Sequence, residues 1–141
     1  RSTIKGDKEL KASLNMFNFN LSKTIDDLIM ETGVKVSRRA IKSIRTQTPS
    51  GKSVKRGNKR HVISPEGSAP NSDSGDLAKS ITSEHNRSTM TSRVGTNQKH
   101  GFFLETSLNR PWLVPALNIE AASLESGIKK AIKNAITKAS T

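Results

Sequence analysis

The side chains best suited to chemistry in this chain are three histidines and twelve acidic residues. Catalytic acids and bases, and the ligands of a metal ion, must converge on one point, and fixed spacing along the chain often reveals them. We find no such spacing for His61, His85 and His100, which fall on a basic loop, a polar segment and a turn. We expect all three histidines to lie at the surface in contact with water.

The acidic residues and the serines also lack the arrangements that catalysis requires. The acids are scattered, and no close pair lies in an apolar setting suited to acid–base work. No serine occupies a nucleophile elbow. Cysteine is absent, which excludes disulfides and thiolate chemistry and removes most structural zinc sites. The sequence therefore predicts a protein that is not an enzyme, with no catalytic residues, no metal site and no cofactor.

Ser50-Gly51-Lys52-Ser53 has the letters that end a phosphate-binding loop, so its context matters. That loop needs another glycine five positions before Gly51, where this chain has Thr46. It also needs a hydrophobic strand before it and a helix start after it, and neither pattern is present. We therefore do not expect a nucleotide site here.

Positive charge is concentrated in one part of the chain. Basic residues outnumber acidic residues by 24 to 12, for a formal net charge of +12, and no acid occurs between Glu31 and Glu66. This interval can be a solvated face, a surface for a polyanion, or a contact for an acidic patch on a neighbouring protein. It contains no aromatic residue, so any contact with DNA would be to the backbone. Its basic residues are Lys35, Arg38, Arg39, Lys42, Arg45, Lys52, Lys55, Arg56, Lys59 and Arg60.

The composition limits how much core the chain can build. A length of 141 residues is typical of one domain, and we treat residues 1–141 as a single domain. Only 32% of the residues are hydrophobic and 4% are aromatic, below the usual share in globular proteins. We therefore expect a thin core whose burial is completed by other subunits, most simply by copies of the same chain, and the alternative is a marginally stable monomer with flexible loops. No stretch approaches the length of a membrane span, and we expect no membrane partner.

The first half of the chain predicts one long helix and then an extended segment. After a flexible N-terminus (1–12), apolar residues recur at steps of three and four over residues 13–45, as on an amphipathic helix. Gly33 favours a bend or break in this helix. Residues 46–73 lack periodicity, and we expect an extended basic loop or arm that becomes ordered on assembly. The apolar stripe of the helix consists of Leu14, Phe17, Leu21, Ile25, Leu28, Val36, Ala40 and Ile44.

Residues 74–112 predict a short helix followed by antiparallel strands. SGDL at the start is a helix-start signal, and VGTN reads as a tight turn between two strands. We expect Phe102 or Phe103 to face the core from the third strand. The short helix is expected at 75–80, and the three strands at 81–87, 90–94 and 101–105.

Residues 113–139 predict a closing helix. Pro111 and Pro115 stiffen its entry, where a proline in the first turn costs little. The predicted fold is α+β, with the long N-terminal and C-terminal helices packed on a small antiparallel sheet and an extended basic loop. The closing helix carries a heptad-like seam, which packs on the first helix or sheet or against a neighbouring subunit. Its members are Leu117, Ala121, Leu124, Ile128, Ala131 and Ala135.

The order of the short motifs is more specific than any one of them. The chain reads SGDLAKSI, then VGTN, then HGFFLET, then RPWLVPAL, after a PEGSAP loop at 65–70. This set resembles the neck or tail-completion proteins (minor tail protein Z type) of long-tailed double-stranded DNA bacteriophages. That family carries TGxLxxSI, VGT, an aromatic run ending in Glu, and RPFLxPAL. The matching residues are Ser74, Gly75, Leu77, Ser80, Ile81, Val94, Gly95, Thr96, Phe102, Phe103, Glu105, Arg110, Pro111, Trp112, Leu113, Pro115, Ala116 and Leu117.

The resemblance implies a structural virion protein of the head–tail junction, assembled in the cytoplasm of the bacterial host. It implies a closed ring of identical subunits, expected to be a hexamer, that completes the tail top and joins it to the head connector. DNA would pass through the lumen of this ring. The implied partners are the connector or head-closure ring, the tail terminator and the tail tube. The chain departs from the family where Thr106 and Ser107 replace Gly-Thr after the glutamate, so we expect a differently shaped loop there.

Three residues of the motif invite two interpretations each. Glu105 and Arg110 bracket the loop before the closing helix, and we favour a local salt bridge or hydrogen bonds that hold this loop over a contact between subunits. Trp112 is either a core residue or an anchor at a subunit boundary. The candidates for an interface or motif role are Leu77, Ile81, Phe103, Glu105, Arg110 and Trp112.

The basic interval supports an alternative function. The chain could be a stand-alone nucleic-acid-binding protein that uses residues 35–60 and needs no ring. Such a protein must bind DNA tightly at physiological salt and lose affinity steeply as salt is added.

Overall fold

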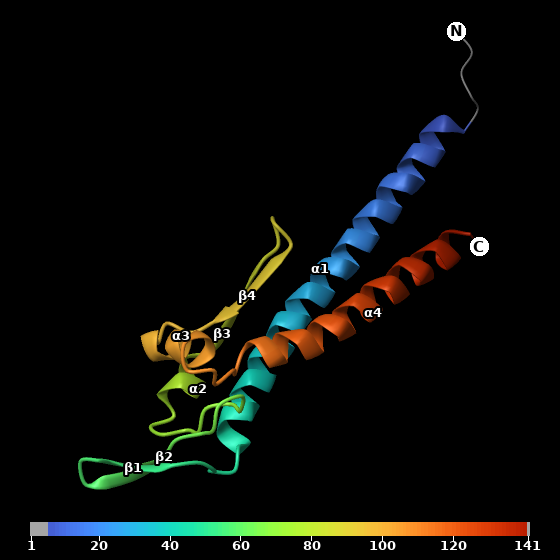
Figure 1. Cartoon of the computed structure of the whole chain (residues 1–141). Helices are drawn as coiled ribbons and strands as arrows, with labels where there is room; N and C mark the ends of the chain where they lie inside the picture. Colours follow the sequence, from blue (N-terminus) through green and yellow to red (C-terminus); the bar gives the residue numbers. More distant parts are fainter. Residues whose placement is uncertain (1–5, 141) are drawn as a thin grey trace.

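The structure, a computed structural model, describes residues 6–140 as two long helices joined by shorter elements (Figure 1). The long helices pack along each other and diverge towards the two termini (Figure 1). The β3–β4 hairpin (residues 82–95) and a short helix pack on the first long helix, while the other hairpin projects away from it, and this arrangement confirms the α+β fold (Figure 1). The elements are α1 (Asp7–Thr46), β1 (Ser53–Arg56), β2 (Lys59–Val62), α2 (Asp76–Ser80), β3 (Thr82–Asn86), β4 (Thr91–Gly95), α3 (Lys99–Thr106) and α4 (Val114–Ala139).

α1 is a single helix of 40 residues. It begins at Asp7, so the flexible N-terminus predicted for 1–12 is wrong for residues 7–12, while residues 1–5 lie outside the described part. Asp7 and Glu9 stand in the first turn, where a negative charge stabilises the positive end of the helix dipole. The helix ends at Thr46, before Gln47 takes an extended backbone conformation.

Gly33 does not bend or break α1, which continues without interruption through this residue. It is buried, and a Cβ atom there would lie 2.8 Å from Ser83 Oγ and 2.9 Å from Ser92 Cβ. The glycine is therefore explained by the close approach of the β3–β4 hairpin to the helix.

The β3–β4 hairpin confirms the first two predicted strands. Its antiparallel register pairs Thr82 with Gly95 and Asn86 with Thr91. Asn86 Oδ1 accepts hydrogen bonds from the backbone amides of Ser88 and Thr89, and these bonds fix the turn between the two strands.

The third predicted strand is wrong, because residues 99–106 form the helix α3. Thr96 Oγ1 accepts a hydrogen bond from the Gln98 amide, so VGTN leads from a strand into a helix. Phe102 and Phe103 are 66% and 56% exposed, and neither faces the core as predicted. Gly101 is buried instead, and Trp112 Nε1 donates a hydrogen bond to its carbonyl oxygen at 2.9 Å. The inward face of this helix therefore holds Gly101 and the half-buried Leu104, and periodicity of apolar residues cannot reveal the glycine.

The predicted extended loop at 46–73 contains a second hairpin. β1 and β2 pair antiparallel with Val54 opposite His61, and Gly57 in the turn has φ of +60°. Each strand has four residues and mostly exposed side chains, so no apolar alternation marks it in the sequence. The two hairpins form separate two-stranded sheets.

α4 begins at Val114, with Pro115 in its first turn. The predicted seam is correct along the middle and end of the helix, where Leu124, Ile128, Ala131 and Ala135 are half-buried. At the start of the helix Leu117 and Ala121 are exposed, so this part of the seam does not pack on α1, and its packing against a neighbouring subunit stays a prediction. Ala116 and Glu120 are the buried residues at the start of α4.

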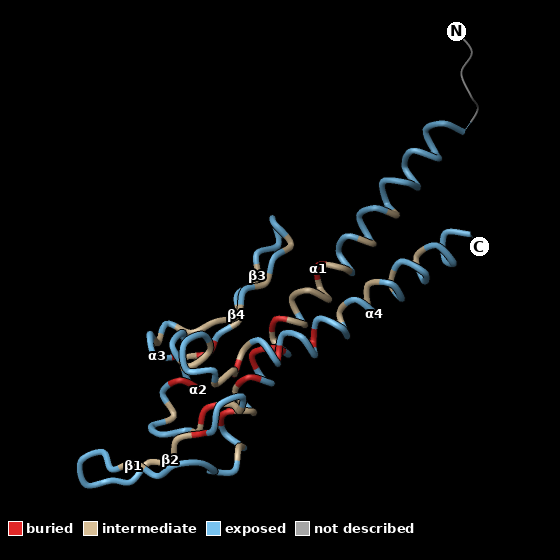
Figure 2. The backbone as a smooth tube through the Cα atoms, in the orientation of Figure 1, coloured by how far each residue is buried: buried red, intermediate tan, exposed pale blue. Residues whose placement is uncertain are grey.

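The core is as thin as the composition predicts. Figure 2 shows most of the buried residues where the C-terminal half of α1 meets α2 and the start of α4, and mostly exposed residues along the N-terminal half of α1. The part of the predicted α1 stripe that is buried is its C-terminal end, whereas Leu14 is 54% exposed. Within residues 6–140, the buried apolar residues are Val36, Ala40, Ile44, Leu77, Ala78, Ile81, Trp112 and Ala116.

Candidate interaction surfaces

The β3–β4 hairpin is attached to α1 by a buried polar cluster. His85 Nε2 lies 2.8 Å from Asp26 Oδ1, and Arg87 Nη1 lies 2.7 Å from Asp26 Oδ2. The side chains of His85 and Asp26 are 8% and 9% exposed. The expectation that His85 is a solvated surface residue is therefore wrong. The sequence contains no signal for this contact, because 59 residues separate the two partners.

Ser92, His85 and Asp26 are in hydrogen-bond contact, as in a serine hydrolase, but with different geometry. His85 Nδ1 is 2.7 Å from Ser92 Oγ, and Nε2 contacts the carboxylate, which reverses the usual roles of the two ring nitrogens. Ser92 Oγ donates its proton to the Ile29 carbonyl at 3.0 Å. The serine thus ends a chain of hydrogen bonds on the backbone of α1, and the cluster fastens the hairpin to the helix.

Arg87 extends the cluster to the surface. Its guanidinium also contacts Asp27 Oδ1 at 3.1 Å. The hydrogen bond to Asp27, followed by the charge of Asp26, raises the pKa of Arg87 above its ordinary value. The two carboxylates therefore favour the charged form of Arg87.

Glu105 holds the start of α4. Its Oε2 accepts hydrogen bonds from the backbone amides of Trp112 at 2.7 Å and Leu113 at 2.9 Å. Its Oε1 accepts a third, from the amide of Val114 at 2.9 Å. These amides belong to the helix start and have no partner within the helix, so the carboxylate acts as a cap supplied by α3. The prediction that Glu105 holds this loop through local contacts is thus correct, and the contacts are hydrogen bonds to backbone amides.

Arg110 binds backbone carbonyls, and it makes no ion pair with Glu105 within residues 6–140. Its Nε donates to the Ser64 carbonyl at 2.7 Å and its Nη1 to the Leu108 carbonyl at 3.1 Å. The Gly67 amide adds a hydrogen bond to the Asn109 carbonyl at 2.6 Å. Arg110 therefore ties the PEGSAP loop to the loop before α4.

Three of the predicted interface or motif candidates are internal. Trp112, Leu77 and Ile81 are 3%, 7% and 6% exposed and belong to the core, so the core interpretation of Trp112 is correct. Phe103 is different, because more than half of it is exposed beside Phe102, with the two rings 6.2 Å apart. Of the apolar candidates, Phe103 is the one available to a partner.

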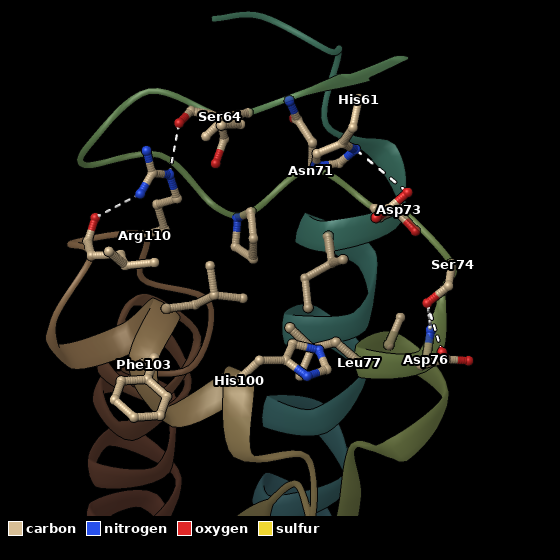
Figure 3. A pocket seen from close by; sticks show the side chains of 18 of the residues that line it. His61, Ser64, Asn71, Asp73, Ser74, Asp76, Leu77, His100, Phe103 and Arg110 are labelled. Atoms are coloured by element: carbon tan, nitrogen blue, oxygen red, sulfur yellow. Dashed lines mark hydrogen bonds and ion pairs between the residues drawn. The ribbon is translucent and has the colours of Figure 1, made fainter. Parts of the chain in front are cut away.

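A cavity of about 610 Å³ opens between these loops and α2 (Figure 3). Leu77 and Leu104 are among the residues that line it, and Phe103 lies at its edge. Ser64 Oγ and Asn71 Oδ1 are buried on the opposite side without a hydrogen-bond partner among the described residues. His61 and His100 both line the cavity, but no group of three His, Asp or Glu side chains within residues 6–140 is arranged to hold a metal ion.

The ten predicted basic residues divide into two groups. Three have acidic partners: Arg39 contacts Glu120, Arg56 contacts Asp73, and Lys35 contacts Glu31. The other seven are exposed and form no ion pair within the described part of the chain. We call these seven the basic surface: Arg38, Lys42, Arg45, Lys52, Lys55, Lys59 and Arg60.

Exposed apolar side chains gather on the two long helices, away from the basic surface. On α1 they occupy the N-terminal half, and on α4 they form a stripe beside the packed face. No helix in the part of the chain that the structure describes has an apolar stretch long enough to cross a bilayer. We call these residues the apolar stripes: Leu10, Leu14, Met16 and Phe19 on α1, and Val114, Leu117, Ile132 and Ile136 on α4.

Comparison of the chain with protein-family models, with curated proteins and with solved structures found no match.

Proposed function

We propose that this chain is a structural subunit of a bacteriophage head–tail junction. It assembles into a closed ring, with six copies as the expected number, which completes the tail top and joins it to the head connector. Its work is done by packing against copies of itself and against neighbouring neck and tail proteins in the virion. The resemblance of the ordered motifs suggests this role, and the uncovered surface of the subunit supports it.

The main support for an assembly is the large surface area that the single chain leaves exposed. A compact monomer of 15.4 kDa exposes about 7,200 Å². This chain exposes 10,506 Å². The excess, roughly 3,000 Å², lies in the range that obligate protein–protein interfaces bury.

The distribution of that surface also favours an assembly. The exposed apolar residues in the N-terminal half of α1, and Ile132 and Ile136 near the end of α4, lie where the two helices diverge, so neither helix covers the other there (Figure 1). Exposed apolar side chains on long helices are stabilised in water when another helix packs on them. A ring supplies such a helix from the next subunit, and cyclic symmetry repeats the contact until the ring closes.

The motif residues support the proposal in a second way. Glu105, Arg110 and Trp112 together build the corner between α3 and α4. This corner sets the direction in which α4 leaves the globular part. In a ring subunit that direction must be the same in every copy, which gives these residues an architectural role.

The experiment that tests the role is to locate the chain in virions and to measure its assembly. Gold-labelled antibodies against the chain should mark the junction between head and tail in purified virions. Sedimentation of the purified chain should show one closed oligomer. Label on another part of the virion, or a monomer at every accessible concentration, would overturn the proposal.

The apolar stripes allow a matched test of the contact. Leu14→Asp and Ile136→Asp place a charge on the stripes and should reduce the oligomer to smaller species. Asn15→Asp and Asn134→Asp place the same charge on neighbouring exposed polar positions of the same helices and should leave the oligomer intact. Equal behaviour of the two pairs would show that the stripes are not the interface.

The second candidate is the stand-alone nucleic-acid-binding protein, which the basic surface favours because its seven cations have no acidic partner within residues 6–140. It predicts tight DNA binding by a monomer. The oligomer measurement distinguishes it from the ring, because both functions allow DNA contact and only one requires assembly.

A further inference from the structure

We propose that the basic surface binds the phosphate backbone of double-stranded DNA, with the β1–β2 hairpin as its main contact. The proposed ring assigns no partner to this surface. The proposal depends on the ring function only in that the phage genome would be the DNA that is bound. The binding chemistry is carried by the arrangement of charges described below.

The hairpin opposes like charges across its two strands. Lys55 pairs with Arg60, and Arg56 pairs with Lys59, in register. Directly opposite like charges destabilise an antiparallel pair. Asp73 relieves one of these pairs through Arg56 at 3.1 Å. The Lys55–Arg60 pair has no acidic partner within residues 6–140, and an anion placed between the two side chains would remove their repulsion.

The hairpin is held firmly at its base, so its charges project from a fixed support. Asn71 Nδ2 donates to the Val62 carbonyl at 2.8 Å, and the Ile63 amide donates to the Lys52 carbonyl at 2.9 Å. His61 Nδ1 lies 3.6 Å from Asp73 Oδ1, beside the cavity of Figure 3. Gly51 has φ of +114°, and a Cβ atom there would overlap the Ile63 carbonyl oxygen, so the chain can return this closely only at a glycine. The result is a short basic projection that extends away from α1 (Figure 1).

The end of α1 continues the same charge. Arg38, Lys42 and Arg45 follow at steps of four and three, which places them on one helix face. That face is opposite to the side on which Ala40 and Ile44 are buried. From the first to the last of these cations the helix rises about 10 Å, a length over which duplex DNA presents about six phosphate charges.

The residue types of the basic surface favour the backbone of duplex DNA over an acidic protein surface or a single-stranded nucleic acid. Protein interfaces have an apolar centre, and none of the exposed large hydrophobic residues of the described chain lies between 20 and 101. Single-stranded nucleic acid is bound by stacking on aromatic side chains, which are absent from residues 35–60. Cations alone neutralise phosphates and read no sequence. We therefore expect binding to duplex DNA that does not depend on its sequence.

The test compares two triple variants of the full chain with the same net charge. Lys55→Gln/Lys59→Gln/Arg60→Gln removes three cations from the hairpin. Lys129→Gln/Lys130→Gln/Lys133→Gln removes three clustered exposed cations from α4. Binding to a short duplex is measured by fluorescence anisotropy over a series of salt concentrations.

The two triples should differ in affinity and in salt dependence. Seven phosphate contacts give a slope of log K against log salt of about −6, and the loss of three brings it to about −4. The hairpin triple should show this change and bind at least tenfold more weakly at moderate salt, while the α4 triple keeps the wild-type slope. Circular dichroism should show that both triples are folded, and the hairpin triple should melt no lower than wild type because a repulsion has been removed.

Three results would overturn the inference. Equal losses in the two triples would show that net charge, and not the hairpin, attracts DNA. Unchanged binding by the hairpin triple would place the contact elsewhere. Tighter binding to polyglutamate than to the duplex would identify the partner as an acidic protein. None of these results bears on the oligomer or on its position in the virion, so the ring would stand or fall by its own measurements.

Discussion

Arg39 on α1 and Glu120 on α4 form an ion pair between the two long helices, with Arg39 Nε and Nη2 each 2.9 Å from Glu120 Oε1. The two side chains differ in exposure, 46% for the arginine and 10% for the glutamate. The loss of stability therefore depends on which partner is removed. An unpaired Glu120 carboxylate would stay buried away from water, whereas an unpaired Arg39 guanidinium could be solvated.

We expect Arg39→Leu to destabilise the protein more than Glu120→Leu. Arg39→Leu leaves a buried carboxylate unpaired and should lower the free energy of unfolding by about 2–3 kcal/mol. Glu120→Leu frees an arginine that can reach solvent, so its loss should be below about 1 kcal/mol. Urea denaturation of both variants and of the double variant measures this order. The opposite order would show that the glutamate is not the buried member of the pair in solution.

The buried cluster around Asp26 gives a second matched comparison. Asp26→Ala removes the acceptor of both His85 and Arg87, and we expect a loss of about 2–4 kcal/mol of unfolding free energy. Asp27→Ala removes a carboxylate that is 48% exposed and should change stability by about 0.5 kcal/mol or less. Chemical denaturation of the two variants decides the matter. Similar losses would mean that the cluster does not fasten the hairpin to α1.

Two glycines in long helices should respond to alanine in opposite ways. At Gly33 the new Cβ would lie 2.8 Å from Ser83 Oγ and 2.9 Å from Ser92 Cβ, so the hairpin must move and Gly33→Ala should destabilise. At Gly127 the nearest atom is Leu28 Cδ2 at 3.7 Å, an ordinary contact. Gly127→Ala should therefore gain about 0.5–1 kcal/mol from helix propensity. Thermal unfolding tests both, and a stabilising Gly33→Ala would contradict the packing of β3–β4 on α1.

Gly33 also shows which features of the fold can be predicted from the sequence and which cannot. The steps of three and four in the apolar stripe were sufficient to predict a long helix, because helix periodicity is a local property. The reason for the glycine was not local. It lies in Ser83 and Ser92, some 50 to 60 positions further along the chain, so a contact between distant segments was interpreted as a bend.

The same distinction explains the other errors. Two adjacent phenylalanines at 102 and 103 favour a strand by residue type, yet the segment is a helix whose buried residue is Gly101. His85 and Asp26 are unremarkable until the fold brings them together. The concentration of basic residues could be predicted from the composition of the interval. The sequence could not show that Arg39 has an acidic partner while Arg38 and Lys42 have none within residues 6–140, because the partner, Glu120, is 81 residues away from Arg39.

Glu105 provides the last prediction, because one carboxylate accepts three amide hydrogen bonds at the start of α4. Glu105→Ala should remove all three and lower the free energy of unfolding by about 2–3 kcal/mol, with fraying of the first turn of α4. Glu105→Gln retains one acceptor oxygen and should lose about half as much. Hydrogen exchange at the amides of Trp112, Leu113 and Val114 should accelerate in the same order. Trp112 is the one tryptophan of the sequence, so its fluorescence reports on the corner between α3 and α4 directly.

The control is Glu125→Ala, which removes an exposed carboxylate further along α4 and should leave both the unfolding free energy and the exchange rates unchanged. Equal exchange rates in Glu105→Ala and wild type would mean that the amides are protected by the helix itself, and the capping role would then be lost.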